Sequence, residues 1–311
     1  MVFKTICQGV RKMFQVFVDS AANIPAERVE QTGIHVIPFI NIVDGKEIPG
    51  FTPGLTPEEE RARGREYYDA IRNGAEVKTS LINTDKFMEE FRPVLAAGED
   101  VLYISLSRNI SGTYNAARLA AEGLADDFTE AKVYLVDSLN ASLAQGILAL
   151  YAVEMREEGK SAEETAKELS ERAHRMNGVF TVDNLKYLAR TGRLSNASAL
   201  FGNLLKIKPL LKGNAEGFIV CFKKCAGRRM ALKNLVDIVC DNIVEPAKQI
   251  IGIAYADAYE DAKWVMEEIL KRISVREFLD TSYDFCTGSH VGPDTIALFF
   301  MGKDRELEGN A

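Results

Sequence analysis

An apolar stretch that leads through a hydroxyl-rich loop into a helix constrains this chain more than any other feature. The stretch covers residues 101–104, the loop holds Ser111, Gly112 and Thr113, and the helical pattern begins at Tyr114. In open α/β sheets ligands bind at the carboxyl ends of strands, and free N–H groups at a helix start favour an anion. Two hydroxyls add neutral donors. The loop therefore suits a carboxylate or phosphate without a buried cation, with helix capping as the alternative role.

The same alternation of strand and helix runs through the first half of the chain. The pattern predicts strands at residues 15–18, 34–43, 77–82, 101–104 and 132–136. It predicts helices at residues 56–71, 84–95, 114–124, 141–158 and 161–176. This order predicts a mostly parallel sheet with helices on both faces. Asp19-Ser20 and Asp137-Ser138 end two of the strands, so we expect them at the sheet edge that carries the Ser111 loop.

Hairpin signals replace the crossovers in the second half. Apolar runs flank the turn at residues 213–217, a pattern typical of a β-hairpin. Short helices are expected at 184–189 and 194–205, and a last strand pair at 278–285 and 295–301. We therefore predict an α/β fold with two domains, at 14–165 and 166–302, the second with a mixed or antiparallel sheet. Residues 1–13 and 303–311 are expected to be terminal extensions.

Composition narrows the functional classes. A net charge of −7 argues against a general nucleic-acid binder, and no apolar run reaches the ~20 residues of a membrane span. Five cysteines without framework spacing fit a reducing cytoplasm. Three scattered histidines predict no metal site. The basic run at 223–229 is expected to be a solvated face, with peripheral contact to an anionic membrane or a partner as the alternative, and we expect a monomer.

Recognisable catalytic and cofactor motifs are missing. No Gly-x-Gly-x-x-Gly fingerprint occurs, and residues 109–112 lack the flanking glycines of a nucleophile elbow. No cofactor is expected.

Several separated segments together resemble the DegV family. They are residues 17–25 (FVDSAANIP), 78–80 (KTS), 111–114 (SGTY), 137–138, 184–188, 192–195, 207–211 and 290–295 (HVGPDT). Their joint order spans about residues 14–302. The resemblance implies a two-domain protein that holds one long-chain fatty acid between its domains. It further implies a non-enzymatic subunit that presents the acyl carboxylate to a separate ATP-dependent fatty acid kinase, which makes an acyl phosphate.

The resemblance also assigns residues. Thr79 and Ser111 would donate to the carboxylate, with Ser80 able to exchange roles with Thr79 and with Gly112 and Thr113 in the same loop. His290, expected at the start of the final hairpin, would lie near the headgroup. Helix capping, or a loop position for His290, is the alternative.

Two further regions are assigned a role. Arg193, expected on an exposed turn, would contact the kinase, with a solvated charge as the alternative. Residues 200–201 and 204–207 and the strands of the second domain are candidate walls of the acyl tunnel, with plain core packing as the alternative.

Two departures from the family pattern concern the same regions. Residues 81–83 read Leu-Ile-Asn where Gln-Pro-Ser is usual, and Thr191 replaces the first of two glycines before Arg193. Other functions stay open: a transferase or hydrolase that uses Ser111 with Asp19 or Asp137, or a regulator that senses lipid and docks on another protein.

Overall fold

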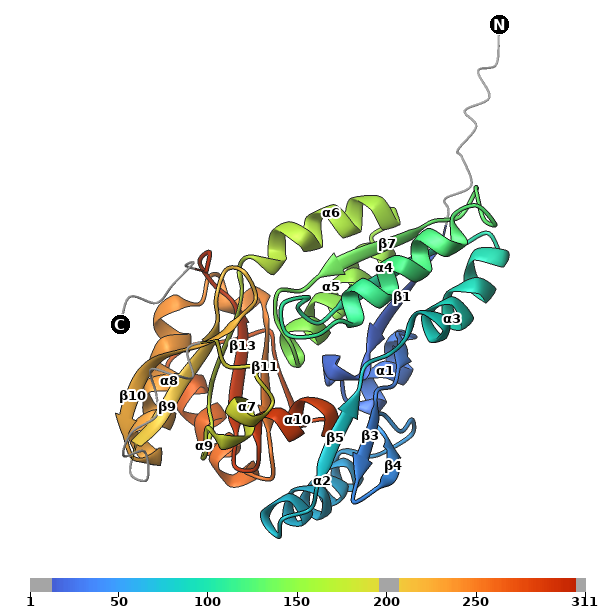
Figure 1. Ribbon diagram of the computed structural model, residues 1–311. Helices are drawn as coiled ribbons and strands as arrows, with labels where there is room; N and C mark the ends of the chain where they lie inside the picture. The colour runs from blue at the N-terminus through green and yellow to red at the C-terminus, as the bar shows by residue number, and fades with distance from the viewer. Residues whose placement is uncertain (1–12, 196–206, 306–311) are drawn as a thin grey trace, which may run out of the picture.

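Four parallel strands form the sheet from which the hydroxyl-rich loop emerges. In a computed structural model that describes residues 13–195 and 207–305, this sheet A has the order β2-β1-β6-β7 (Figure 1). Its strands are β1 (Phe14–Asp19), β2 (His35–Ile37), β6 (Asp100–Ser105) and β7 (Val133–Asp137). Every pair is parallel, and Ser105 lies opposite Asp137. The predicted parallel sheet is confirmed, and the ends of β1, β6 and β7 share one edge.

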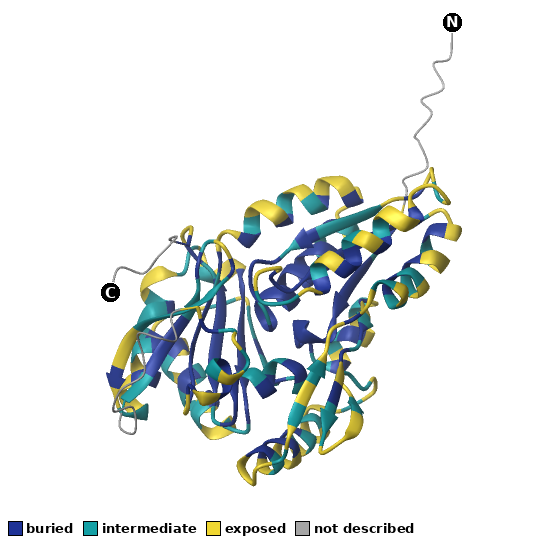
Figure 2. Cartoon of the chain, viewed as in Figure 1, coloured by how far each residue is buried: buried dark blue, intermediate teal, exposed yellow. Residues whose placement is uncertain are grey.

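Helices cover both faces of sheet A. A short 3₁₀ turn and six α-helices belong to this part of the chain: η1 (Ser20–Ala22), α1 (Ala26–Thr32), α2 (Pro57–Arg72), α3 (Thr84–Ala96), α4 (Thr113–Leu124), α5 (Leu143–Glu157) and α6 (Ala162–Ala173). Helices α3 and α4 pack on one face and α5 and α6 on the other. The outer sides of α3, α4 and α6 are exposed, whereas the strands between the helix layers are mostly buried (Figure 2).

A small antiparallel sheet B carries Thr79. It has the order β4-β3-β5, with β3 (Ile40–Val43), β4 (Lys46–Pro49) and β5 (Val77–Ser80). The expected single strand over 34–43 is wrong, because the chain leaves sheet A after β2 and enters sheet B at β3. Pro38 has no N–H to donate, and the Phe39 N–H donates to Ser20 Oγ at 3.0 Å instead of to a strand.

The second half of the chain forms a six-stranded mixed sheet C of order β10-β9-β8-β13-β11-β12. Only its β11–β12 pair is parallel. Its elements are β8 (Met176–Thr181), α7 (Lys186–Arg190), β9 (Ile207–Gly213), β10 (Ile219–Ala226), α8 (Arg228–Asn242), η3 (Pro246–Lys248), β11 (Ile250–Tyr255), α9 (Tyr259–Leu270), β12 (Glu277–Ser282), α10 (Phe285–Val291) and β13 (Ile296–Met301). The mixed sheet and the β9–β10 hairpin are confirmed.

Two expectations for this half need comment. The strand expected over 278–285 ends early, at Ser282, because Asp284 caps a helix: its Oδ1 accepts from the Thr287 N–H at 2.9 Å. The helix expected at 194–205 falls mostly on residues 196–206, which lie outside the described residues.

Helix α5 joins the two halves. Every residue from 143 to 153 is buried, because α5 packs against β1 and β6 of sheet A and against β8, β11 and β13 of sheet C. A helix that is apolar all round requires such a position. We call sheets A and B with α1–α6 the N-terminal lobe, and sheet C with α7–α10 the C-terminal lobe. The domain division at residue 165 stays a prediction.

Candidate functional site

A cavity of about 190 Å³ lies between the lobes, at the carboxyl edge of sheet A. The N-terminal lobe contributes Thr79, Ser111 and Gly112, and the C-terminal lobe contributes Arg193 and His290. The remaining lining is mainly apolar: Phe39, Leu81, Leu106, Ile110, Ala141, Leu188, Ile219, Cys286, Thr287 and Val291. We call this space the headgroup cavity.

The start of α4 supplies donors to the cavity. Gly112 is the N-cap residue and offers no side-chain cap, and the first turn has no acidic residue. Ser111 Oγ lies 2.9 Å from Thr113 Oγ1 and accepts the Thr113 N–H at 3.2 Å. Neither hydroxyl residue is the N-cap, so first-turn N–H groups are left for an anion.

Thr79 and His290 meet across the lobes. Thr79 Oγ1 lies 3.3 Å from His290 Nε2. Thr79 stands in β5, within the strand expected over 77–82, and His290 stands in α10 rather than at the start of a hairpin. Sheet B and α10 therefore place side chains 211 residues apart in sequence at one point.

His290 is neutral at pH 7. Burial, and then the charges of Arg193 and Arg190, lower the pKa of its imidazole to about 4. Its Nδ1 is buried and makes no hydrogen bond within the described residues. A neutral ring has one N–H, so it can donate to a ligand or to Thr79 without adding charge.

Arg193 is half-buried rather than exposed as expected, although Gly192 beside it is exposed. Its guanidinium donates to the Thr191 carbonyl, and the side chain lines the headgroup cavity. The cavity therefore has a cation that the sequence reasoning did not require.

The other two predicted hydroxyls lie outside the cavity lining. Ser80 is exposed, and its hydroxyl donates to the Leu81 carbonyl at 3.4 Å. Thr113 is fully buried behind Ser111 and fixes the Ser111 hydroxyl. Cys286, a buried thiol in the cavity wall, was missed because a lone cysteine gives no sequence signal.

A second space of about 50 Å³ adjoins the headgroup cavity and shares Ile110, Ala141, Ile219, Thr287 and Val291 with it. Its other lining residues come from both lobes: Leu139, Asn140, Ser142, Gly178, Phe180, Gly213, Gly217, Tyr283 and Phe299. We call it the inner chamber. A chain that starts in the headgroup cavity can continue there among mainly apolar side chains.

The carboxylates that could serve Ser111 as a base are engaged elsewhere. Asp19 accepts from Tyr103 Oη at 2.7 Å and from Gln145 Nε2 at 3.0 Å, and burial raises its pKa to about 6. Asp137 pairs with Arg108 at 2.9 Å. Thr113 is the side chain that contacts the Ser111 hydroxyl, so this geometry shows no nucleophile and base pair.

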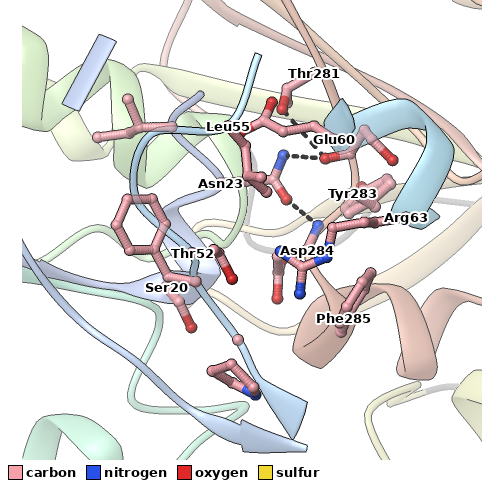
Figure 3. Close-up of a pocket in the computed structure, with 15 residues that line it drawn as sticks. Ser20, Asn23, Thr52, Leu55, Glu60, Arg63, Thr281, Tyr283, Asp284 and Phe285 are labelled. Atoms are coloured by element: carbon pink, nitrogen blue, oxygen red, sulfur yellow. Dashed lines mark hydrogen bonds between the residues drawn. The ribbon is translucent and has the colours of Figure 1, made fainter. Parts of the chain in front are cut away.

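A polar junction lies next to the headgroup cavity, at the start of α10 (Figure 3). Asn23 Nδ2 donates to the Ser282 carbonyl at 3.0 Å, and Asn23 Oδ1 accepts the Asp284 N–H. Burial raises the pKa of the Asp284 carboxyl to about 7, and its Oδ2 makes no hydrogen bond within the described residues. The junction ties η1 to the helix that carries His290.

Two negative findings hold for the described parts of the chain. No helix there is long and apolar enough to cross a membrane. No group of three or more His, Cys, Asp or Glu side chains there is placed to hold a metal ion.

Comparison with known proteins gives the family. The family model described as "Uncharacterised protein, DegV family" matches residues 13–303. The chain belongs to the DegV family. The DegV domain-containing protein CPE0026 of Clostridium perfringens is 36% identical over 296 residues, which is 95% of this chain and 99% of that protein.

Solved DegV structures have the same fold. The structure of a DegV family protein from Thermus thermophilus, described as fatty acid binding, has a TM-score of 0.82 against this chain at 25% identity. The match covers 93% of this chain and 99% of that one. DegV from Bacillus subtilis, described as a fatty acid binding protein, has a TM-score of 0.79 at 28% identity, covering 94% and 100%. The α/β fold with one parallel and one mixed sheet is thus confirmed.

Proposed function

We propose that this chain binds one long-chain fatty acid between its lobes, with the carboxylate in the headgroup cavity and the tail in the inner chamber. The observation that carries the proposal is that these two spaces share five lining residues, with polar groups at the α4 start and mainly apolar side chains beyond it. Each buried methylene contributes roughly 0.8 kcal/mol, so a 16-carbon tail contributes on the order of 12 kcal/mol before binding costs. The tail holds the ligand, and the polar groups position its headgroup.

In this arrangement the carboxylate accepts hydrogen bonds from Ser111, from Thr79 or His290, and from the N–H groups of the first turn of α4, which follows Gly112. Arg193 balances its charge from the opposite wall. Thr113 positions Ser111, and Ser80 has no direct role. Solved relatives described as fatty-acid-binding support the ligand class.

We further propose that the bound carboxylate is presented to a separate ATP-dependent kinase in the cytoplasm. Within the described residues the Ser111 hydroxyl hydrogen-bonds to Thr113 and to no carboxylate or imidazole, which favours a carrier over an enzyme. Exposed Gly192 next to Arg193 gives a partner access to this wall. Cys225, Cys240 and Cys286 are free thiols, which fits a reducing compartment.

Native mass spectrometry of freshly purified protein tests the binding proposal, with a solvent extract analysed in parallel. We expect an added mass of one long-chain fatty acid per chain. A ligand-free mass that palmitate and oleate do not shift would overturn it. Adding ATP and a bacterial fatty acid kinase to the loaded protein tests the second step, and absence of acyl phosphate would limit the chain to lipid binding.

A further inference from the structure

The inner chamber contains a buried hydroxyl whose hydrogen-bonding capacity the described residues do not fully satisfy. Ser142 lines the chamber and is 1% exposed, and its Oγ makes no hydrogen bond of ordinary geometry within the described residues. Its polar neighbour is the hydroxyl of Tyr283, which also lines the chamber. When Tyr283 donates to Ser142, the hydrogen of the Ser142 hydroxyl has no acceptor within the described residues. An unpaired buried donor costs stability, so an acceptor from a ligand would have a clear effect.

The N-terminus of α5 also favours a ligand oxygen next to Ser142. Ser142 is the N-cap residue of this 15-residue helix, yet its side chain makes no cap hydrogen bond, and the first turn has no acidic residue. The N-terminal N–H groups of a helix carry a partial positive charge that favours oxygen. The backbone of Ser142 has a φ of 58°, which residues other than glycine rarely adopt. The fold therefore holds this hydroxyl in place at the cost of backbone strain.

The residues that line the inner chamber limit which kind of ligand oxygen can bind there. Among the described residues that line the inner chamber, none is Lys, Arg or His. A second carboxylate would be buried there without a cation, which is strongly unfavourable. A hydroxyl or keto oxygen needs only a donor such as the free hydrogen of this Ser142–Tyr283 pair.

We propose that the inner chamber selects long-chain fatty acids that carry a neutral oxygen substituent on the chain, bound by Ser142 and Tyr283. This inference rests on the proposed function, because it assumes that the acyl chain lies in the chamber. It deepens that function by naming the class of acyl chain.

The test measures dissociation constants of the delipidated full chain for stearate and for its 3-, 10- and 12-hydroxy derivatives. One hydroxy isomer should bind roughly five- to tenfold more tightly than stearate, as expected for one added hydrogen bond. Tyr283→Phe and Ser142→Gly, which suits the positive φ, should each bring that ratio to about one. The matched controls Tyr134→Phe on β7 and Ser170→Ala on exposed α6 should keep it.

The outcomes separate the two proposals. If stearate binds and no hydroxy isomer binds more tightly, the selection is refuted and the fatty-acid proposal stands. If neither class binds, the proposed function itself fails. If both chamber variants fail to fold, the ratio of the dissociation constants for stearate and its hydroxy derivatives in the unsubstituted protein still decides whether the chamber selects a hydroxyl.

Discussion

At the scale of single residues, the proposed function gives Ser111 two separable effects, one on binding of the fatty acid and one on its presentation to a kinase. Its hydroxyl is fixed by Thr113 at 2.9 Å and stands beside the open start of α4. One neutral hydrogen bond contributes about 1 kcal/mol, far less than the tail. Its larger effect is therefore to orient the carboxylate.

Ser111→Ala should weaken fatty-acid binding only about fivefold but reduce acyl-phosphate formation by a larger factor. The cause is a carboxylate that stays bound yet turns away from the kinase. Binding by calorimetry and transfer with a kinase and ATP measure both on one preparation, with Ser170→Ala as the control. A large loss of affinity with normal transfer by the remaining complex would contradict this prediction.

Asp284 should make stability depend on pH. Its pKa is raised from 3.8 to about 7 by burial, so the folded state keeps a proton that the unfolded chain releases above pH 4. The contribution of this carboxyl to the free energy of unfolding is fully present at low pH and is lost as pH rises through about 7. The loss is on the order of 2–4 kcal/mol. Asn also caps helices, so Asp284→Asn should keep α10 and remove this loss.

Urea unfolding of both proteins at pH 5 and pH 8 measures the effect. The variant should gain stability relative to the parent between the two pH values. Asp126→Asn, at an exposed position, is the control. Equal pH dependence in parent and Asp284→Asn would show that this carboxyl does not control it.

Sequence reasoning reached some of these residues and not others. The motifs of the resemblance named Thr79, Ser111 and His290, and the structure places all three at one cavity. Arg193 follows a glycine turn, a pattern that indicates exposure, but the neighbouring lobe half-buries it. Contacts between distant segments decided that outcome, and no local pattern records them.

At the scale of elements, α10 is the part that local patterns misjudge most. It occupies residues expected to be strand and loop, because Asp284 caps it and α2 packs beside it. Tyr67 Oη donates to the Phe285 carbonyl at 2.7 Å, and Tyr68 Oη donates to the Tyr283 carbonyl at 3.1 Å. By contrast, the start of the helix expected over 56–71 is confirmed, because the capping box that Thr56 forms with Glu59 acts within one turn.

Gly288→Ala should displace α10 from α2. A Cβ at Gly288 would overlap the hydroxyl and ring of fully buried Tyr68. We expect a loss of roughly 2 kcal/mol or more in unfolding free energy, together with weaker fatty-acid binding, because His290 moves with the helix. Gly123→Ala in α4 is the matched control, since its Cβ would make only ordinary contacts with Met88.

Thermal unfolding and a palmitate titration measure the two effects. The control should be neutral or slightly stabilising, because alanine favours a helix more than glycine does. Unchanged stability and affinity in Gly288→Ala would mean that Tyr68 yields without moving α10.

At the scale of the whole molecule, the lobes share one core, and the proposed fatty acid lies between them. Buried residues of sheets A and C belong to the same apolar cluster through α5. Arg72 pairs across the lobes with Asp257 at 2.6 Å and with Asp294 at 2.9 Å. Bound fatty acid should therefore stabilise both lobes together.

Palmitate at a hundred times its dissociation constant should raise the unfolding free energy by about 2.7 kcal/mol in one cooperative transition. Denaturant unfolding with and without ligand, followed by far-UV circular dichroism and by Trp264 fluorescence in the C-terminal lobe, measures it. Methyl palmitate, which lacks the carboxylate, should stabilise less. Two separate transitions, with only one shifted by palmitate, would contradict this prediction.

The order of sheet C also determines when the protein can finish folding during synthesis. Strand β13 lies between β8 and β11, although it is the last strand of the described chain. Sheet A and the helices that cover it are complete by the end of α6 at Ala173, so they can form while later residues are still being translated. Sheet C stays split until Met301 has left the ribosome, and its unpaired inner edges are open to chaperones until then. A ribosome that stalls before β13 would therefore release a chain with one finished lobe and one that is prone to aggregate.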